Sequence, residues 1–211
     1  MRNKILKPLV FLAALLPLAR LVYYFRTDNL GANPIEVITH STGTWTLIFV
    51  MITLSITPLR RLSGLLWIVQ YRRMVGLFAF FYGVLHFITY IWLDQSLDLQ
   101  SIVKDVYKRP FITAGFTAFV LMIPLALTST KGWIRRLGKG WVKLHRLIYL
   151  TAIAGVTHYI WLVKKDIRVP LIYAGILTAL LGYRIVMQIV SRVRKDTAAR
   201  RPGPPVGVPA D

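Results

Sequence analysis

Residues 74–93 read MVGLFAFFYGVLHFITYIWL, a stretch of 20 residues without a formal charge. A helix of about 20 apolar residues can cross the hydrocarbon core of a bilayer. The whole chain has 211 residues, of which 55% are hydrophobic, and its mean hydropathy is +0.56. This is more apolar surface than one soluble core could bury, so we expect a lipid bilayer to surround the protein.

Five further apolar runs accompany this stretch, with approximate bounds 8–25, 43–59, 111–128, 144–163 and 171–190. The connecting segments are short and polar, and Pro58, Pro110 and Pro170 mark expected helix ends. The sequence therefore predicts an all-α, polytopic membrane protein with a six-helix transmembrane bundle over residues 1–196. Pro17 is expected to kink the first helix. Residues 197–211 are expected to form a disordered cytoplasmic tail, because they are rich in proline and glycine.

The basic residues indicate how the bundle is oriented. On one side of it lie 19 of the 27 lysines and arginines: at the amino end and after the second, fourth and sixth helices. By the positive-inside rule this side is cytoplasmic, so both termini are expected in the cytoplasm. The third and fifth helices then run in the same direction. The same topology accounts for the net charge of +19, so we do not expect nucleic-acid binding.

Two histidines provide the first candidate site. His86 lies in the third run and His158 in the fifth, about 10 and 8 Å below the outer boundary at 1.5 Å per residue. An ionisable side chain at such depth is usually functional. Because imidazole is an axial ligand of haem iron and facing helices can clamp a porphyrin, the pair predicts a haem site. The alternative is a pair of core histidines that hydrogen-bond to neighbouring groups.

Two glycines support the haem interpretation. Gly83 and Gly155 each precede one of these histidines by three residues, and a residue at i−3 lies on nearly the same helix face. A missing side chain there would let a flat ring approach the backbone. Ordinary packing of small residues between membrane helices explains the glycines equally simply.

The remaining candidates lie elsewhere along the predicted helices. His145, at the cytoplasmic start of the fifth helix, is about 20 Å from His158 along the axis, so it would serve a haem near the inner surface or have another role. Arg72 and Arg73 could pair with haem propionates or a flavin phosphate, although topology alone also explains basic residues in a cytoplasmic loop. His40 is expected to be a helix cap or an interfacial residue.

Several other chemistries find no support in the sequence. The chain has no cysteine, which excludes disulfides, iron–sulfur clusters and cysteine nucleophiles. Its eight acidic residues all lie in predicted loops or in the tail, so no carboxylate is buried for cation transport. There is also no glycine-rich nucleotide loop and no H-E-x-x-H motif. A small transporter with core histidines remains an alternative.

A set of short motifs resembles the MsrQ (YedZ) family of haem-binding membrane subunits, within the wider ferric-reductase-like transmembrane group. Each motif is weak alone, but their order and spacing over about residues 30–184 are specific. They are TG at 42–43, ITPLR at 56–60, RRMVGL at 72–77, LH at 85–86, KRPFI at 108–112, LTST at 127–130, LHRLIY at 144–149, HYIW at 158–161 and PLIYAG at 170–175.

The resemblance implies a function in electron transfer. Members of the family bind haem b together with FMN, in the bacterial inner membrane. They pass electrons from the quinone pool to a periplasmic, molybdopterin-containing methionine-sulfoxide reductase subunit, with which they form a heterodimer that repairs oxidised envelope proteins. The chain would then be an electron-transfer subunit rather than the catalytic one. Alternatives are a self-sufficient ferric or metal reductase and a b-type cytochrome for another periplasmic acceptor.

On this resemblance His86, His158 and His145 are candidate metal ligands, and Arg72 and Arg73 are further candidate cofactor contacts. The wider group carries two histidines on each of the third and fifth helices, whereas here the third helix has only His86. This departure leaves the number of haems open.

Overall fold

The computed structural model describes residues 2–163 and 165–199, and the regular structure in these ranges is entirely helical. The predicted all-α class is therefore confirmed, and each predicted apolar run corresponds to one long helix. The long helices are α1 (Arg2–Arg26), α2 (Pro34–Ser63), α3 (Arg72–Ile88), α5 (Pro110–Leu127), α8 (Leu147–Leu162) and α9 (Arg168–Ala199). The short ones are the 3₁₀ helix η1 (Leu66–Tyr71), the π-helical η2 (Thr89–Asp94) that continues α3, α4 (Leu99–Lys108), α6 (Lys131–Leu137) and α7 (Lys139–Leu144).

Helix α2 is longer than its apolar run because its caps extend it. The Asn33 side chain accepts a hydrogen bond from the Glu36 N–H at 3.3 Å, and Pro34 occupies the first turn. At the other end Gly64 adopts a left-handed conformation with φ 71° and donates to the Arg60 carbonyl. Pro58 therefore lies inside α2, and the prediction that it marks a helix end is wrong.

The connection between η2 and α5 is also more ordered than predicted. In place of a short polar loop it contains α4, whose first turn is capped by the Asp98 carboxylate. The cap helps to stabilise α4, because this helix is amphipathic and buries only the turn at Ile102. Its apolar side, formed by Leu99, Val103 and Tyr107, is exposed.

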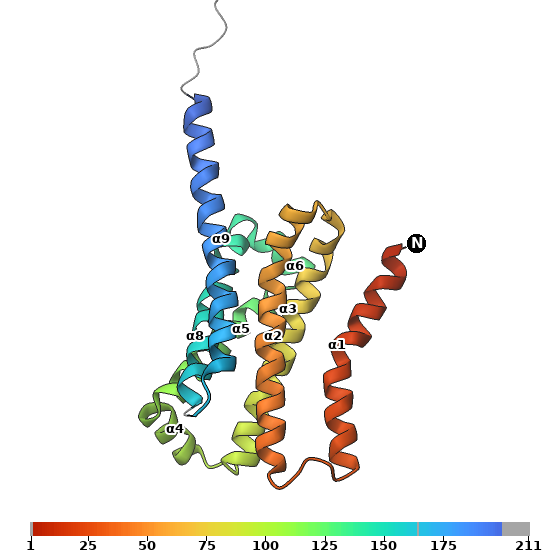
Figure 1. Ribbon diagram of the computed structural model, residues 1–211, viewed down its shortest axis with the longest axis vertical. Helices are drawn as coiled ribbons and strands as arrows, with labels where there is room; N and C mark the ends of the chain where they lie inside the picture. The colour runs from red at the N-terminus through yellow and green to blue at the C-terminus, as the bar shows by residue number, and fades with distance from the viewer. Residues whose placement is uncertain (1, 164, 200–211) are drawn as a thin grey trace, which may run out of the picture.

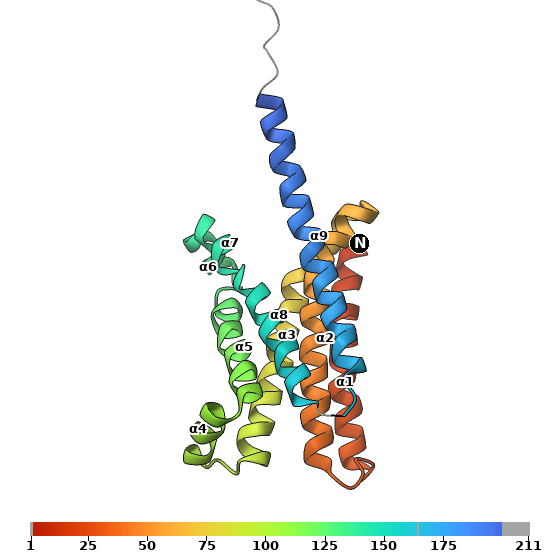
Figure 2. The same cartoon turned by 60° about the vertical axis from the view of Figure 1, so that its left-hand side comes forward.

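The core of the bundle consists of two antiparallel helix pairs, α2 with α3 and α5 with α8, which meet mainly along α3 and α5 (Figures 1 and 2). Helix α9 packs against α8 and α2, and α1 against α2 and α3. The most buried apolar side chains of the core are on three of these helices: Val50, Leu54, Ala79, Tyr82 and Ala152, each 2% exposed or less. The core thus lies where the two pairs meet.

Helix α1 is tied to this core at its proline. Pro17 has no N–H, so the hydrogen-bond ladder of α1 is weakened there. The Tyr82 hydroxyl donates to the Ala14 carbonyl at 2.9 Å and accepts from the Leu18 N–H at 3.2 Å, so it inserts into the ladder next to the proline. Figure 1 shows α1 changing direction near its middle, where a kink at Pro17 is predicted.

The chain is a polytopic membrane protein. Within the described part of the chain, five helices are long and apolar enough to cross a membrane: Ile5–Arg26, Pro34–Ser63, Leu66–Asp94, Pro110–Leu127 and Arg168–Arg194. The sixth, α8, has 16 residues and spans about 24 Å, less than a hydrocarbon core of about 30 Å. It nevertheless lies alongside the others in the bundle (Figure 2). The count of six spans therefore stays a prediction.

The connections are sorted to the two ends of the bundle. One end, which we term the inner end, holds the first turns of α1, the whole of η1 and α6, and the last turns of α9 (Figure 1). The α1–α2 connection and α4 lie at the opposite, outer end. Helices α3 and α8 run in the same direction, as predicted, whereas which end faces the cytoplasm stays a prediction. Helix α9 continues through Ala199, past the predicted domain boundary at 196. The rest of the predicted tail, 200–211, lies outside the described residues.

Candidate cofactor site

A cavity of about 540 Å³ lies between α2, α3, α5 and α8 toward the outer end of the bundle. Its innermost part is lined by Val50, Met122 and other mostly apolar side chains. Its rim, where the outer ends of the helices meet, includes Asn33, Glu36 and Arg109. The cavity therefore changes from apolar to polar toward the outer end, and its size is typical of cofactor sites.

His86 of α3 and His158 of α8 both line this cavity. Their ring centres are 6.2 Å apart and the ring planes are inclined by 72°. The structure thus brings the two histidines together in one cavity, whereas their common depth in the membrane and their role as ligands stay predictions. Imidazole nitrogens bind transition metals at about 2 Å and lie about 1 Å from their own ring centre, so two axial ligands of one metal have ring centres roughly 6 Å apart. The observed separation fits a shared metal.

The hydrogen bonds of the two rings fix their protonation. Nδ1 of His86 lies 2.9 Å from the Thr39 carbonyl of α2, and Nδ1 of His158 lies 2.6 Å from the Phe111 carbonyl of α5. A carbonyl can only accept, so each Nδ1 donates a proton, and in the neutral ring each Nε2 retains a free lone pair. A backbone acceptor behind the ring is the usual arrangement for histidines that bind metals through Nε2.

Glycines on the same two helices make room for the rings. A Cβ atom on Gly43 of α2 would lie 3.0 Å from Cε1 of His86, and a Cβ on Gly115 of α5 would lie 2.8 Å from Nδ1 of His158. Such distances are shorter than normal van der Waals contact. Each imidazole is therefore held between a backbone carbonyl and a bare stretch of helix backbone.

The two half-sites repeat with a constant spacing of 72 residues. Thr39 and Phe111, Gly43 and Gly115, and His86 and His158 are each separated by 72 positions, and so are Gly83 and Gly155. The α2–α3 pair and the α5–α8 pair thus supply equivalent ligand units. Sequence reasoning missed Thr39, Phe111, Gly43 and Gly115, although the shared spacing of the glycines and histidines was visible in the sequence.

Gly83 and Gly155 both line the cavity, on the predicted face. An added Cβ would meet only ordinary contacts, 3.6 Å from Thr46 at Gly83 and 3.8 Å from Leu47 at Gly155. Helix packing therefore does not require these glycines. Their suggested role in admitting a flat ring stays a prediction.

His145 lies apart from this cavity, between α7 and α8, at the inner end. Its Nε2 is 3.3 Å from the Thr128 hydroxyl, which itself donates to the Pro124 carbonyl, so Nε2 donates and only Nδ1 is left free. The ring packs on Trp141, with centres 3.8 Å apart. Burial, and then the charge of Arg72, lower its pKa below the ordinary value for histidine. A role for His145 in a cofactor site stays a prediction.

Arg72 and Arg73 also lie at the inner end and do not line the cavity. Arg72 donates to the Thr57 hydroxyl at 3.4 Å, and Arg73 is exposed. The structure therefore separates the predicted arginine contacts from the His86–His158 pair. Among the described residues, no group of three or more histidine, aspartate or glutamate side chains could hold a metal ion.

Arg184 of α9 is a polar anchor that sequence reasoning missed. Its guanidinium donates to the Leu54 carbonyl at 2.7 Å and to the Tyr149 hydroxyl at 2.9 Å, and it lies 5.1 Å above the Tyr149 ring. It thus ties α9 to α2 and α8. The signal was present, because an arginine within the apolar run 171–190 must find buried partners.

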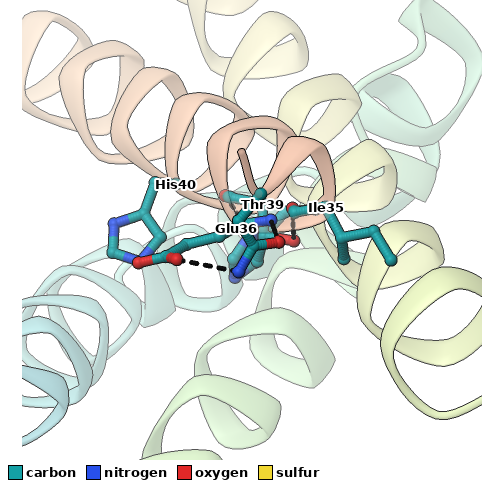
Figure 3. Close-up of polar contacts among 6 residues, drawn as sticks. Ile35, Glu36, Thr39 and His40 are labelled. Atoms are coloured by element: carbon teal, nitrogen blue, oxygen red, sulfur yellow. Dashed lines mark hydrogen bonds and ion pairs between the residues drawn. The ribbon is translucent and has the colours of Figure 1, made fainter. Parts of the chain in front are cut away.

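His40 lines the rim of the cavity and is half-exposed. Its Nε2 lies 3.9 Å from the Glu36 carboxylate, and Figure 3 shows the two side chains near each other on the first turns of α2, where Thr39 also bonds to the Ile35 carbonyl. It is not the cap, because that position belongs to Asn33. The alternative prediction of an interfacial residue fits its place at the rim.

Comparison with known proteins places this helical architecture in a class. Residues 42–156 match the family described as ferric reductase like transmembrane component. This range contains His86 and the two glycines that make room for the rings, Gly43 and Gly115, and it ends two residues before His158. No solved structure matches the chain.

Curated relatives cover almost the whole chain. A protein of Herminiimonas arsenicoxydans is 52% identical over 198 residues, covering 92% of this chain and 91% of its own length. One from Ralstonia nicotianae is 54% identical, covering 83% and 82%, and one from Xanthomonas euvesicatoria is 47% identical, covering 96% and 94%. Each is named protein-methionine-sulfoxide reductase heme-binding subunit MsrQ. The chain therefore belongs to the MsrQ family, within the ferric-reductase-like transmembrane components.

Proposed function

We propose that His86 and His158 are the two residues that would hold the iron of a haem b bound in the cavity. The observation that supports this most directly is the paired hydrogen bonding of the rings, which leaves an Nε2 lone pair on each of two imidazoles 6.2 Å apart. When bound, haem supplies reversible one-electron transfer. The haem-binding name of the relatives supports the same assignment.

The chain's own residues would prepare and hold the ligands. The Thr39 and Phe111 carbonyls keep each proton on Nδ1 and fix the ring orientation, so that no proton must leave when a metal binds. Gly43 and Gly115 bring the backbone against the rings and limit their motion. Phe87 and Phe119, stacked with ring centres 4.4 Å apart, line the cavity and provide an apolar wall for a macrocycle.

The function we assign is electron transfer to a methionine-sulfoxide reductase. The protein would take electrons from the quinone pool and pass them to a periplasmic, molybdopterin-containing partner with which it forms a heterodimer. That partner would repair oxidised proteins of the envelope. The support is the name shared by the relatives, which calls them subunits of such a reductase, together with a site suited to a redox cofactor.

The proposed topology places this activity in the bacterial inner membrane. Six membrane-spanning helices with both termini cytoplasmic would set the haem near the periplasmic face, next to the partner. FMN, if bound as in the family, would lie at the inner end, where Arg72 and Arg73 offer positive charge to its phosphate and His145 lies close by. His145 would then act there, or as a ligand of a second haem.

Absorption spectroscopy of the purified protein tests the haem assignment. We expect a low-spin, bis-histidine spectrum in the wild type, because two nitrogen ligands occupy both axial positions. His86→Ala and His158→Ala should each abolish it. His40→Ala is the matched control, because it removes a rim imidazole whose Nε2 faces Glu36 instead. A normal low-spin spectrum in both ligand variants would refute the assignment.

A further inference from the structure

The outer rim of the cavity holds a hydrogen-bond donor that the histidine pair does not use. Tyr90 lies in η2, four residues after His86 and so about one helical turn farther out. It lines the cavity, and its hydroxyl is buried without a hydrogen-bond partner among the described residues. Because buried hydroxyls are nearly always satisfied, the Tyr90 hydroxyl points to a missing acceptor. Its position in a π-helical segment, which is common at functional sites, supports the same interpretation.

A second donor lies on the same rim. Arg109 stands immediately before α5, two residues from the carbonyl that orients His158. It is the one lysine or arginine among the described residues that line the cavity. Its Nε pairs with Asp105 at 3.3 Å, and no described group contacts its terminal nitrogens. The Tyr90 hydroxyl lies within electrostatic range of the Asp105 and Asp94 carboxylates as well as of Arg109.

The acidic groups of the rim are already paired. Glu36 accepts from the Asn33 amide at 3.0 Å and lies beside His40 (Figure 3). Asp94 accepts from the Gln95 amide at 2.9 Å. The donors left without a partner on the rim are the Tyr90 hydroxyl and the terminal nitrogens of Arg109, and the fork of N–H groups of a guanidinium matches a carboxylate.

The two ends of the cavity select an amphiphilic ligand. Its inner part is lined by Val50, Ala118 and Met122, which offer no charge. A ligand with a flat apolar body and carboxylates along one edge would satisfy both ends, because burying its carboxylates among these apolar side chains would be costly. A porphyrin with propionate side chains has this shape and charge.

We propose that Arg109 and Tyr90 bind a propionate carboxylate of the haem and so fix its orientation, with the propionate edge toward the outer end of the bundle. The proposal rests on the proposed function, because it requires a haem between His86 and His158. It adds Arg109 and Tyr90 as positioning residues, and it gives the direction in which the propionate edge of the haem points. The edge of the haem nearest to an outer docking partner is then the propionate edge.

The test compares haem with haem dimethyl ester, in which both propionates are esterified and uncharged. Both are titrated into the full-length protein prepared without haem, and the variants are Arg109→Met, Arg109→Lys and Tyr90→Phe. We expect the wild type to bind haem about 10-fold more tightly than the ester, since a charge-assisted hydrogen bond is lost. Arg109→Met should remove most of this preference, Tyr90→Phe part of it, and Arg109→Lys should retain part. Lys108→Met is the matched control, because Lys108 is exposed and does not line the cavity.

The outcomes separate this proposal from the proposed function. An equal affinity of the wild type for both porphyrins, or an unchanged preference in Arg109→Met and Tyr90→Phe, would overturn the propionate contact while leaving the histidine ligands intact. A wild type that gives a low-spin spectrum with neither porphyrin would instead overturn the haem site itself. If Arg109→Met fails to fold, the Tyr90→Phe and Arg109→Lys titrations still decide the question.

Discussion

Replacing Gly115 by alanine tests the idea that bare backbone holds the ligand ring. The new Cβ would lie 2.8 Å from Nδ1 and 3.0 Å from Cε1 of His158, whereas atoms in contact normally lie about 3.5 Å or more apart. The ring must therefore retreat by roughly 0.7 Å. Such a movement alters the 2.6 Å hydrogen bond to the Phe111 carbonyl that fixes Nδ1 as the donor.

The free-energy terms of this substitution can be compared. Overpacking typically costs about 1–3 kcal/mol, and a weakened hydrogen bond about 1 kcal/mol. The gain in helix propensity from glycine to alanine is at most about 1 kcal/mol. The net effect is a loss, and we expect it to weaken haem binding by about 10-fold. Gly43→Ala, where the closest contact would be 3.0 Å, should show a smaller loss of the same kind.

The assay is the rate at which haem leaves the purified protein for an apoprotein acceptor, together with the haem-to-protein ratio. Gly175→Ala in α9 is the matched control, because a Cβ there meets nothing within 4 Å. It should keep the wild-type rate and gain slightly in stability. Wild-type haem retention and an unchanged spectrum in Gly115→Ala would refute the role given to Gly115.

Three further predictions concern other parts of the molecule. Tyr82→Phe removes both hydrogen bonds at the Pro17 bend and should lower the free energy of unfolding by about 1–3 kcal/mol, measured by denaturant titration in detergent; an unchanged midpoint would show that the tyrosine is not an anchor. His145→Ala should leave the outer haem spectrum unchanged. A fall in the haem-to-protein ratio would indicate an inner haem, whereas a fall in turnover alone would indicate a quinone or flavin role. No change in either quantity would exclude both roles. Double charge reversal of Lys104 and Lys108 on α4 should slow reoxidation of the reduced protein by the proposed periplasmic partner in a salt-dependent way, and stopped-flow traces identical to those of the wild type would argue against docking at this end.

The histidine pair could be predicted from sequence because helix geometry alone fixes depth. His86 and His158 lie at similar distances from the ends of apolar runs, and a constant rise per residue converts those distances into a common level. The acceptors behind the rings could not be predicted in this way. The Thr39 and Phe111 groups are backbone carbonyls, which every residue has, so only the packing of α2 on α3 and of α5 on α8 selects them.

The remaining differences also have physical reasons. Asn33 and Gly64 set the ends of α2 through capping, so the helix exceeds the apolar run that predicted it. Arg184 is one of the 19 basic residues that the charge count assigns to the side facing the cytoplasm, but its hydrogen bonds to Leu54 and Tyr149 place it within the bundle. A positive-inside count treats every arginine alike. Burial in the structure distinguishes the arginines that join helices from those that face lipid headgroups.

The 72-residue repeat has a consequence for assembly. The α2–α3 hairpin and the α5–α8 hairpin each carry one of the two histidines. Neither hairpin alone can therefore supply both ligands of the metal. In a bilayer, lipid tails are as apolar as leucine side chains, and little hydrophobic force draws two inserted hairpins together. A metal that bonds to both is then a clamp between halves of the protein, and its binding free energy adds to their association. We expect the bound cofactor to strengthen the association of the two hairpins, so that the protein without haem should be degraded faster by membrane proteases than the protein with haem.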